Sequence, residues 1–230
     1  MKIFSKYDIM LWGVSAVLIT GSFFMFSGGG ILTLIASLLG VTSIIINAKG
    51  HPLGQLMMVV FSILYGIISY SFSYYGEMAT YLGMTGPMAL FSFVSWLRNP
   101  YKQGCAEVRV NSLKPPEILL MAVIMTVVTF IFYHILAFFG TANLPISTLS
   151  VTTSFIAVYL TFRRSAFFSL AYAANDVILI LLWTIASRTD QGYISVVICF
   201  VLFLVCDIYG FISWDKMKRR QNSENLPQNH

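Results

Sequence analysis

The sequence predicts an all-α integral membrane protein with eight transmembrane helices, and three observations lead to this prediction. Of its 230 residues, 57% are hydrophobic and 10% are charged, whereas soluble domains are about 25% charged. The apolar residues gather in stretches of roughly 20 residues, the length that crosses about 30 Å of hydrocarbon as a helix. If all eight stretches cross, every Lys and Arg except Arg188 falls on one side of the bilayer.

The eight predicted spans follow one another with short connections. They are 7–26, 28–47, 54–73, 79–97, 116–139, 144–162, 166–186 and 192–213. Each is expected to be a helix, because lipid offers no partner to a free backbone N–H or C=O group. The positive-inside rule places the basic side in the cytoplasm. Both termini are therefore predicted to be cytoplasmic.

Residues 1–27 are predicted to form an additional N-terminal transmembrane helix. Lysines followed by an apolar run also begin a signal peptide, but this run is long and Gly21–Gly30 offers no clear A-x-A cleavage site. We therefore expect the helix to be retained. The charge pattern of the other seven spans is the same with or without it.

Two segments of the chain resemble each other and predict an internal repeat. The stretch ILTLIASLLGVTSIIINAKG from Ile31 resembles ISTLSVTTSFIAVYLTFRRS from Ile146, and the copies later close on Ser95-Trp96 and Ser213-Trp214. Both copies are predicted to enter from outside and end inside, so they are parallel and need one extra crossing between them. The alternative is a chance match of aromatic-rich helix ends. The predicted segments are repeat 1 (28–99), a cytoplasmic loop and linker helix (100–140), repeat 2 (141–216) and a cytoplasmic tail (217–230).

This plan resembles the PnuC vitamin transporters, bacterial relatives of the SWEET sugar transporters. The resemblance covers about residues 28–216 and rests on GPMALFSFVSW from Gly86, the Asn175-Asp176 pair, and DIYGFISW from Asp207. It implies a 3+1+3 arrangement of helices in a bacterial inner membrane, and it is compatible with a homo-oligomer. It also implies facilitated diffusion of a nicotinamide riboside-like solute, which a cytoplasmic kinase traps by phosphorylation. Relatives carry thiamine, riboflavin or deoxynucleosides, so these remain alternative substrates.

The chain departs from the family pattern at two positions associated with the substrate pocket. Ala89 stands where a Gln often follows the Pro-Met pair, and Tyr172 stands where a Trp usually precedes the Asp by four residues. These departures bear on nicotinamide riboside as the substrate more than on transport itself.

Polar residues within the spans predict the substrate pocket. Asp176 lies near the middle of its span, where a carboxylate costs about 2.5–3.5 kcal/mol on insertion scales, so it should face the bundle interior or a water-filled cavity. Helical spacing places on one stripe Tyr172, Asp176, Leu179 and Trp183, with Asn175 beside it. A carboxylate and an amide can bind sugar hydroxyls, while Tyr172 and Trp183 can stack on a planar or cationic ring. The alternative is that these polar residues form a buried hydrogen-bond network that joins neighbouring helices.

A second set of candidate substrate-binding residues comes from the ends of the two repeats: Asp207, Tyr209, Phe91 and Trp96. Asp207 is expected either to pair with a group of the linker helix or to contact the substrate. Trp96 is expected either to contact the substrate or, like Trp214, to anchor its helix at the lipid interface.

The two repeats are unequal in polarity. Phe61 and Val60 occupy the positions in the first repeat that correspond to Asp176 and Asn175 in the second. Polar recognition is therefore expected to be concentrated in the second repeat, which suits a ligand with one polar and one aromatic end.

No motif in the sequence predicts a catalytic residue, a metal site or a cofactor. His134 is the only His within the predicted spans, and there is no HExxH, GxSxG or DxD-type pattern. The three Cys residues, Cys105, Cys199 and Cys206, lack metal-ligand spacing and are expected to be reduced. The net charge of +5 follows from the topology, so the expected partners are the bilayer and a small molecule rather than nucleic acid.

Three classes of function remain. The favoured one is a uniporter for a vitamin or nucleoside-like solute; the others are a proton-coupled carrier in which Asp176 or Asp207 titrates, and an intramembrane enzyme. Alternating access needs a flexing element, and Gly83–Pro87 is the candidate, because a Pro within a helix removes a hydrogen bond and kinks the helix. A static kink is the alternative.

Overall fold

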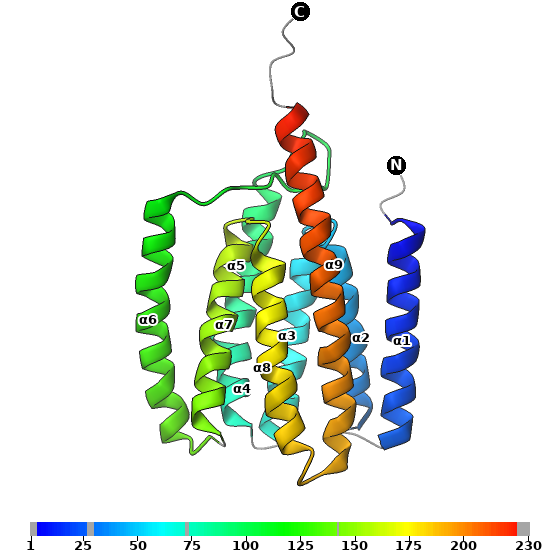
Figure 1. Cartoon of the computed structure of the whole chain (residues 1–230), viewed down its shortest axis with the longest axis vertical. Helices are drawn as coiled ribbons and strands as arrows, with labels where there is room; N and C mark the ends of the chain where they lie inside the picture. Colours follow the sequence, from blue (N-terminus) through cyan, green and yellow to red (C-terminus); the bar gives the residue numbers. More distant parts are fainter. Residues whose placement is uncertain (1–3, 27–29, 72–73, 142, 225–230) are drawn as a thin grey trace, which may run out of the picture.

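A computed structural model describes residues 4–26, 30–71, 74–141 and 143–224. Within these residues the protein is helical, apart from two isolated β-bridges in the connections. The helices are α1 (Lys6–Phe26), α2 (Gly30–Asn47), α3 (Leu53–Ser71), α4 (Tyr75–Thr80), the π-helix η1 (Tyr81–Thr85), α5 (Gly86–Leu97), α6 (Pro115–Phe138), α7 (Leu144–Phe162), α8 (Phe168–Ala186), the 3₁₀ turn η2 (Gln191–Tyr193) and α9 (Ile194–Glu224). The long helices run side by side (Figure 1).

The predicted all-α class and the predicted spans are confirmed. In the described residues, seven uninterrupted helices are long and apolar enough to cross a membrane. The predicted fourth span is a composite of α4, η1 and α5, which join through residues in helical conformation. Its predicted start at residue 79 is wrong, because the chain is already helical from Tyr75. The predicted tail, which starts at residue 217, is helical at first, because α9 continues to Glu224.

Parts of the predicted segments lie outside the described residues. These parts are 1–3, 27–29, 72–73, 142 and 225–230. Lys2, which contributes to the predicted basic side, is among them.

The helices close into a ring with two helices outside it. Around the ring, α2 packs on α3, α3 on the α4–α5 composite, α5 on α7, α7 on α8, α8 on α9, and α9 on α2. Outside this ring α6 packs on α7, while α1 packs on α2 and α9, as Figure 1 also shows. Within the ring, α2, α3 and the α4–α5 composite thus contact one another in chain order, and α7, α8 and α9 do the same.

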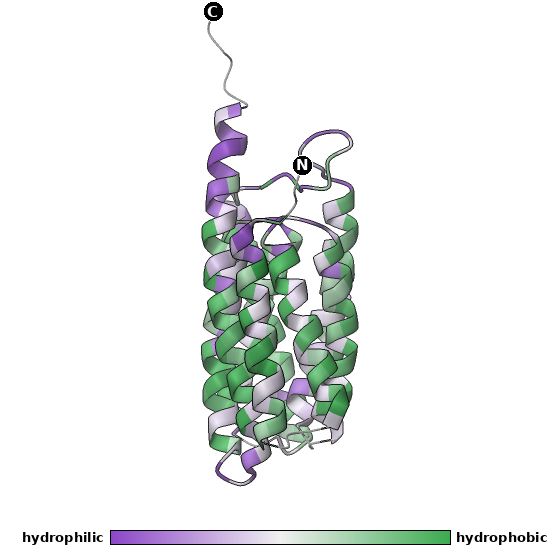
Figure 2. Cartoon of the chain, turned by 90° about the vertical axis from the view of Figure 1, so that its right-hand side faces the viewer, coloured by the Kyte–Doolittle hydropathy of each residue, from purple (hydrophilic) through white to green (hydrophobic). Residues whose placement is uncertain are grey.

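The surface of the bundle has the polarity that a bilayer requires. Hydrophobic residues cover the sides of the helices, and polar residues gather at the ends and on the last turns of α9 (Figure 2). Large exposed apolar side chains include Leu119, Phe130 and Phe138 of α6. Among the described residues, every Lys and Arg except Arg188 lies at the end of the bundle that carries both termini, here called the terminal end.

Two tryptophans join the halves of the ring at the terminal end. The indole N–H of Trp96 at the end of α5 donates to the Thr161 carbonyl of α7 (3.0 Å). In the same way, the indole N–H of Trp214 in α9 donates to the Asn47 carbonyl of α2 (2.8 Å). The preceding serines donate to neighbouring carbonyls, Ser95 to Phe162 (3.1 Å) and Ser213 to Ala48 (2.7 Å). The C-terminal carbonyls of a helix have no partner within it, so each half caps a helix of the other.

The prediction that Trp96 and Trp214 anchor helices at the lipid interface is wrong. Their exposed fractions are 1% and 0%, and their ring centroids lie 5.3 Å apart inside the bundle. Both indole N–H groups are bonded to the protein, so neither ring is positioned to reach lipid headgroups.

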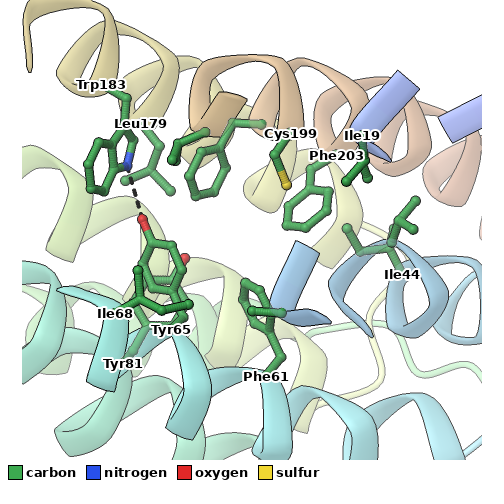
Figure 3. Close-up of a cluster of buried hydrophobic side chains, with 14 of the residues drawn as sticks. Ile19, Ile44, Phe61, Tyr65, Ile68, Tyr81, Leu179, Trp183, Cys199 and Phe203 are labelled. Carbon is green, nitrogen blue, oxygen red and sulfur yellow. Dashed lines mark hydrogen bonds between the residues drawn. The ribbon is translucent and has the colours of Figure 1, made fainter. Parts of the chain in front are cut away.

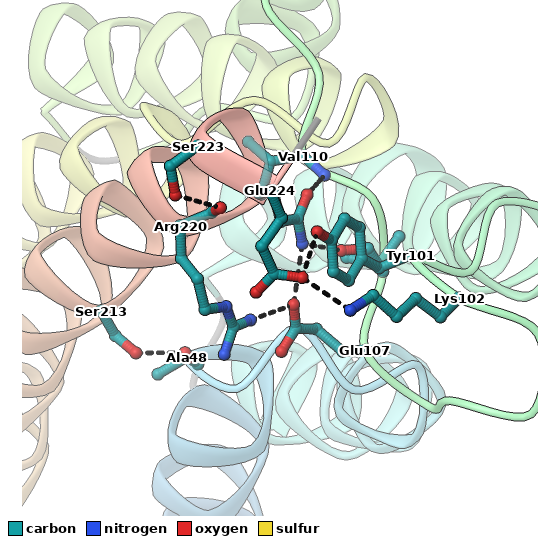
Figure 4. Close-up of polar contacts among 11 residues, drawn as sticks. Ala48, Tyr101, Lys102, Glu107, Val110, Ser213, Arg220, Ser223 and Glu224 are labelled. Atoms are coloured by element: carbon teal, nitrogen blue, oxygen red, sulfur yellow. Dashed lines mark hydrogen bonds and ion pairs between the residues drawn. The ribbon is translucent and has the colours of Figure 1, made fainter. Parts of the chain in front are cut away.

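The connection between α5 and α6 lies across the terminal end and binds α9. Gln221 donates to the Val108 carbonyl (3.0 Å) and accepts from the Val110 N–H (2.8 Å). Glu107 accepts from Gln221 and pairs with Arg220, and Glu224 pairs with Lys102 (Figure 4). Residues 217–224 are therefore part of a packed cap on this end.

The additional helix α1 is held to the ring by a buried ion pair. Asp8 is fully buried, and its carboxylate lies 2.7 Å from the Lys49 ammonium in the α2–α3 connection. Tyr209 of α9 donates to Asp8 and accepts from Lys49 (3.1 Å). Burial disfavours the charge of Lys49, but the hydrogen bonds with Asp8 and Tyr209 outweigh burial and raise the pKa of Lys49.

Asp8→Asn is expected to destabilise the protein by about 1–3 kcal/mol, because it leaves the Lys49 ammonium without its charged partner. Thermal unfolding in detergent should show a lower midpoint for this variant. Lys49→Met in the same background should recover part of the loss. The control Asp215→Asn removes only an exposed contact with Arg219 and should leave the midpoint unchanged. An unchanged midpoint in Asp8→Asn would show that the network does not hold α1.

Candidate functional site

The candidate site begins with an amide held by two hydroxyls inside the bundle. Asn175 of α8 is 2% exposed, and its carbonyl oxygen accepts hydrogen bonds from Thr153 (2.8 Å) and Ser154 (3.0 Å) of α7. Two donors on one oxygen set the orientation of the amide. Because Asn175 lies midway along α8, this polar group lies far from both ends of the bundle.

Two carboxyl groups meet beside this amide. Asp176 of α8 and Asp207 of α9 are each 4% exposed, and their side chains lie within hydrogen-bonding reach of each other. No donor among the described residues reaches Asp176 Oδ2. A hydrogen bond between two carboxyl groups requires a proton on one of them. The pair is therefore a place for a proton or for a ligand that offers donors.

Tyr172 lies one turn from this pair. Its ring is half-buried, interacts electrostatically with both Asp207 and Asp176, and bonds to the Thr161 side chain. Phe168 packs edge-on against it, with ring centroids 6.3 Å apart. Of the predicted stripe, Asp176, Leu179 and Trp183 are buried, and Tyr172 is half-buried.

An aromatic cluster lies between this polar group and the end opposite the termini. The indole N–H of Trp183 donates to the Tyr65 hydroxyl of α3 (2.9 Å), and Tyr65 packs on Tyr81 with ring centroids 4.4 Å apart (Figure 3). Phe61 and Phe203 pack edge-on beside them. The cavity that these rings line has about 20 Å³, room for about one water molecule. The cluster is thus closed, and the bond between Tyr65 and Trp183 joins the two halves of the ring.

Sequence reasoning missed a third buried carboxyl group, Glu77. It lies in α4, is 2% exposed, and accepts a long hydrogen bond from Ser150 of α7 (3.4 Å). The third span of the first repeat thus also contains a buried carboxyl group, and the concentration of polar recognition in the second repeat stays a prediction. The omission of Glu77 follows from starting that span at residue 79. Glu77 stands four residues before Tyr81, so both lie on one face of a helix. This spacing is the sequence feature from which the burial of Glu77 could have been predicted.

Three of the predicted substrate-binding residues lie apart from this cluster. Phe91 is 57% exposed on the outer surface of α5. Trp96 is buried at the terminal end with its N–H bonded to Thr161. Tyr209 is bonded to Asp8 and Lys49. Of the two expectations for Asp207, pairing with the linker helix is wrong, because its neighbour is Asp176 of α8.

The segment Gly83–Pro87, which was predicted to flex or kink, overlaps a π-helix. Residues Tyr81–Thr85 form a π-helix, and Pro87 occupies the first turn of α5 directly after it. Single π-helical turns are rare and frequent at functional sites. Here the π-helix begins with the buried Tyr81 of the aromatic cluster. Whether this segment flexes stays a prediction.

No group of three or more His, Cys, Asp or Glu side chains able to hold a metal ion occurs among the described residues. The chemistry of the cluster is instead that of binding: amide and carboxyl groups next to aromatic rings. Polar groups at the membrane midplane that contact an enclosed aromatic cluster are typical of membrane transporters.

The comparisons with known proteins agree with this class. The chain belongs to the nicotinamide mononucleotide transporter family, whose model matches residues 30–216. It is similar to the nicotinamide riboside transporter PnuC of Neisseria mucosa, at 24% identity over 94% of this chain and 82% of that protein. It is also similar to the protein of the same name from Haemophilus influenzae, at 22% identity over 83% of this chain and 82% of that protein.

The fold is shared with a solved structure. The crystal structure of the vitamin B3 transporter PnuC superposes with a TM-score of 0.78, at 23% identity, over 95% of this chain and 94% of that chain. The chain is thus a multi-pass membrane transporter by family and by fold.

Opposite effects on stability are expected from two neighbouring substitutions in the cluster. Asp207→Asn should stabilise the protein by about 1 kcal/mol, because an amide donates to Asp176 without adding a second carboxyl group. Asn175→Ala should destabilise it by about 1 kcal/mol, because Ser154 loses its acceptor. Thermal unfolding in detergent without substrate measures both. A lower unfolding midpoint for Asp207→Asn would show that the two carboxyl groups stabilise the bundle.

Proposed function

We propose that this protein transports nicotinamide riboside, or a related B-vitamin or nucleoside such as thiamine, riboflavin or a deoxynucleoside, by facilitated diffusion. Family membership supports transport. The observation that carries the site is the buried cluster of Asn175, Asp176 and Asp207, with its unpartnered carboxylate oxygen at the centre of the bundle. In this proposal Asn175 and Asp176 bind the sugar hydroxyls, Asp207 and Tyr172 support them, and Trp183 packs against the base.

The charges around the cluster favour a riboside over a mononucleotide. Asp176, Asp207 and Glu77 are acidic, and no Lys or Arg of the described residues lies within the middle of the ring. A phosphate group placed there would meet carboxylates with no cation to balance it, which is costly away from water. A nicotinamide ring linked to ribose is a cation and meets complementary charge.

The proposed mechanism is alternating access between two parallel halves. We propose that residues 28–99 and 141–216 are the two repeats of a SWEET-like 3+1+3 fold, with 100–140 as loop and linker and 1–27 as an additional, retained helix. The order of contacts around the ring supports this, as do the reciprocal bonds of Trp96 and Trp214. The terminal end is proposed to be cytoplasmic, because it carries the Lys and Arg residues. Phosphorylation by a cytoplasmic kinase then retains the substrate in the cell.

A proton-coupled carrier is the second candidate function, and one observation favours it. The contact between Asp176 and Asp207 needs a proton or a cationic ligand. If the pair exchanges that proton with each transport cycle, substrate movement is coupled to the proton gradient. Nothing in the described residues gives comparable support to an intramembrane enzyme.

Uptake into liposomes should separate these functions. The purified protein is expected to equilibrate labelled nicotinamide riboside across the membrane at the same final level with and without a pH gradient. Labelled nicotinamide mononucleotide should enter much more slowly. Accumulation above the outside concentration only with a gradient would establish the proton-coupled carrier instead. Conversion of the substrate without uptake would point to an enzyme.

Two substitutions test the residues of the site. Asp176→Ala and Trp183→Ala are expected to abolish measurable binding of the transported substrate, because one removes the sugar contact and the other a ring wall. Isothermal titration measures the affinity, and size-exclusion elution in detergent checks that the variants fold. Phe91→Ala is the matched control, since this side chain faces outward, and it should bind as the unaltered protein does. Unchanged affinity in both site variants would refute the assignment.

A further inference from the structure

Glu77 is a buried carboxylate that the proposed sugar contacts do not use. Its Oε1 has only the long bond from Ser150, and no donor among the described residues reaches its Oε2. None of the ion pairs between described residues includes it. A carboxyl group inside a membrane bundle is costly, and such groups commonly mark a ligand or ion pathway. The unpartnered oxygen therefore needs an explanation.

Two stacked tyrosines lie near this carboxylate. Tyr81 follows Glu77 by four residues along the α4–η1 helix and therefore lies one turn away on the same face. Tyr65 of α3 packs on Tyr81, with ring centroids 4.4 Å apart. Tyr65 is in turn bonded to Trp183, whose ring packs against Tyr74 with centroids 4.7 Å apart. A carboxylate near the faces of aromatic rings can bind a flat organic cation, because both the negative charge and the ring faces attract it.

We propose that Glu77, Tyr65 and Tyr81 form a subsite for the cationic ring of the substrate, separate from the polar cluster at Asp176. This proposal rests on the proposed function and deepens it, because it assigns the charge selectivity of the pathway to one residue. The subsite lies toward the end opposite the termini, since Glu77 is within the first turns of α4. The rings are closed on one another here, so a ligand enters only when Tyr65 and Trp183 part.

The alternative role for Glu77 is structural. In that case the carboxyl group ties α4 to α7 through Ser150, and the charge of a ligand has no effect on binding. The two roles differ in one measurable property, the preference for a cation over a neutral molecule of the same shape.

The test compares 1-methylnicotinamide, a cation methylated on its ring nitrogen, with nicotinamide, its neutral counterpart, by titration of the purified protein in nanodiscs. The unaltered protein should prefer the cation by about tenfold or more, a difference of about 1.4 kcal/mol per tenfold. Glu77→Gln should lose this preference and keep its affinity for nicotinamide, while Glu77→Asp should retain part of it. Asp190→Asn removes a charge from a loop at the same end, where Asp190 caps η2, and should behave as the unaltered protein.

Two results would overturn the subsite: equal or absent binding of both compounds by the unaltered protein, or a full cation preference in Glu77→Gln. If Glu77→Gln does not fold, Tyr81→Leu should lose the preference and Tyr81→Phe should keep it; the same preference in both would count against the subsite. A cation preference without riboside uptake would contradict the proposed function alone. Uptake of the riboside without a cation preference would contradict the subsite alone.

Discussion

The bonds from Trp96 and Trp214 to the ends of the opposite helices are the contacts on which the bundle depends most. Lipid tails are as apolar as the helix surfaces, so helices in a membrane gain little from burying apolar side chains against one another. Hydrogen bonds and close packing set their alignment instead. Each indole N–H adds a hydrogen bond to a helix-end carbonyl of the other half, so the two halves are joined at the terminal end. The aromatic and polar clusters between α3, α8 and α9 are positioned by this closure.

The interior of the ring contains two kinds of polar group with different roles. Ser95, Ser213 and the two tryptophans have complete sets of partners and join helices. By contrast, Asp176 and Glu77 each keep a carboxylate oxygen without a donor among the described residues. Such groups do not stabilise the folded protein, and natural proteins accept that loss of stability at functional sites. We propose that these two carboxylates belong to the substrate pathway, whereas the bonded serines and tryptophans belong to the scaffold.

Much of the fold follows from the sequence, because the bilayer imposes helix length and charge placement on each span. The spans, Asp176 and its stripe were predicted for this reason. The contacts between helices were not predicted, because hydropathy does not show which face of a helix packs on which neighbouring helix. Tryptophan is common at lipid interfaces, but the indole N–H groups of Trp96 and Trp214 donate to carbonyls inside the protein. Asp8 and Lys49 lie far apart in the sequence, and only the fold brings them together. Glu77 was missed because the predicted span starts at residue 79, whereas the chain is already helical from Tyr75.

We propose one pathway that binds the sugar at Asn175 and Asp176 and the ring near Tyr65 and Tyr81. The decisive measurement is a structure of the protein with nicotinamide riboside bound. Ribose hydroxyls are expected within hydrogen-bonding distance of Asn175 and Asp176, with the pyridinium ring directed toward Tyr81. A ligand held elsewhere would contradict it, for example in the cleft at the terminal end lined by Lys49, Cys105 and Lys216.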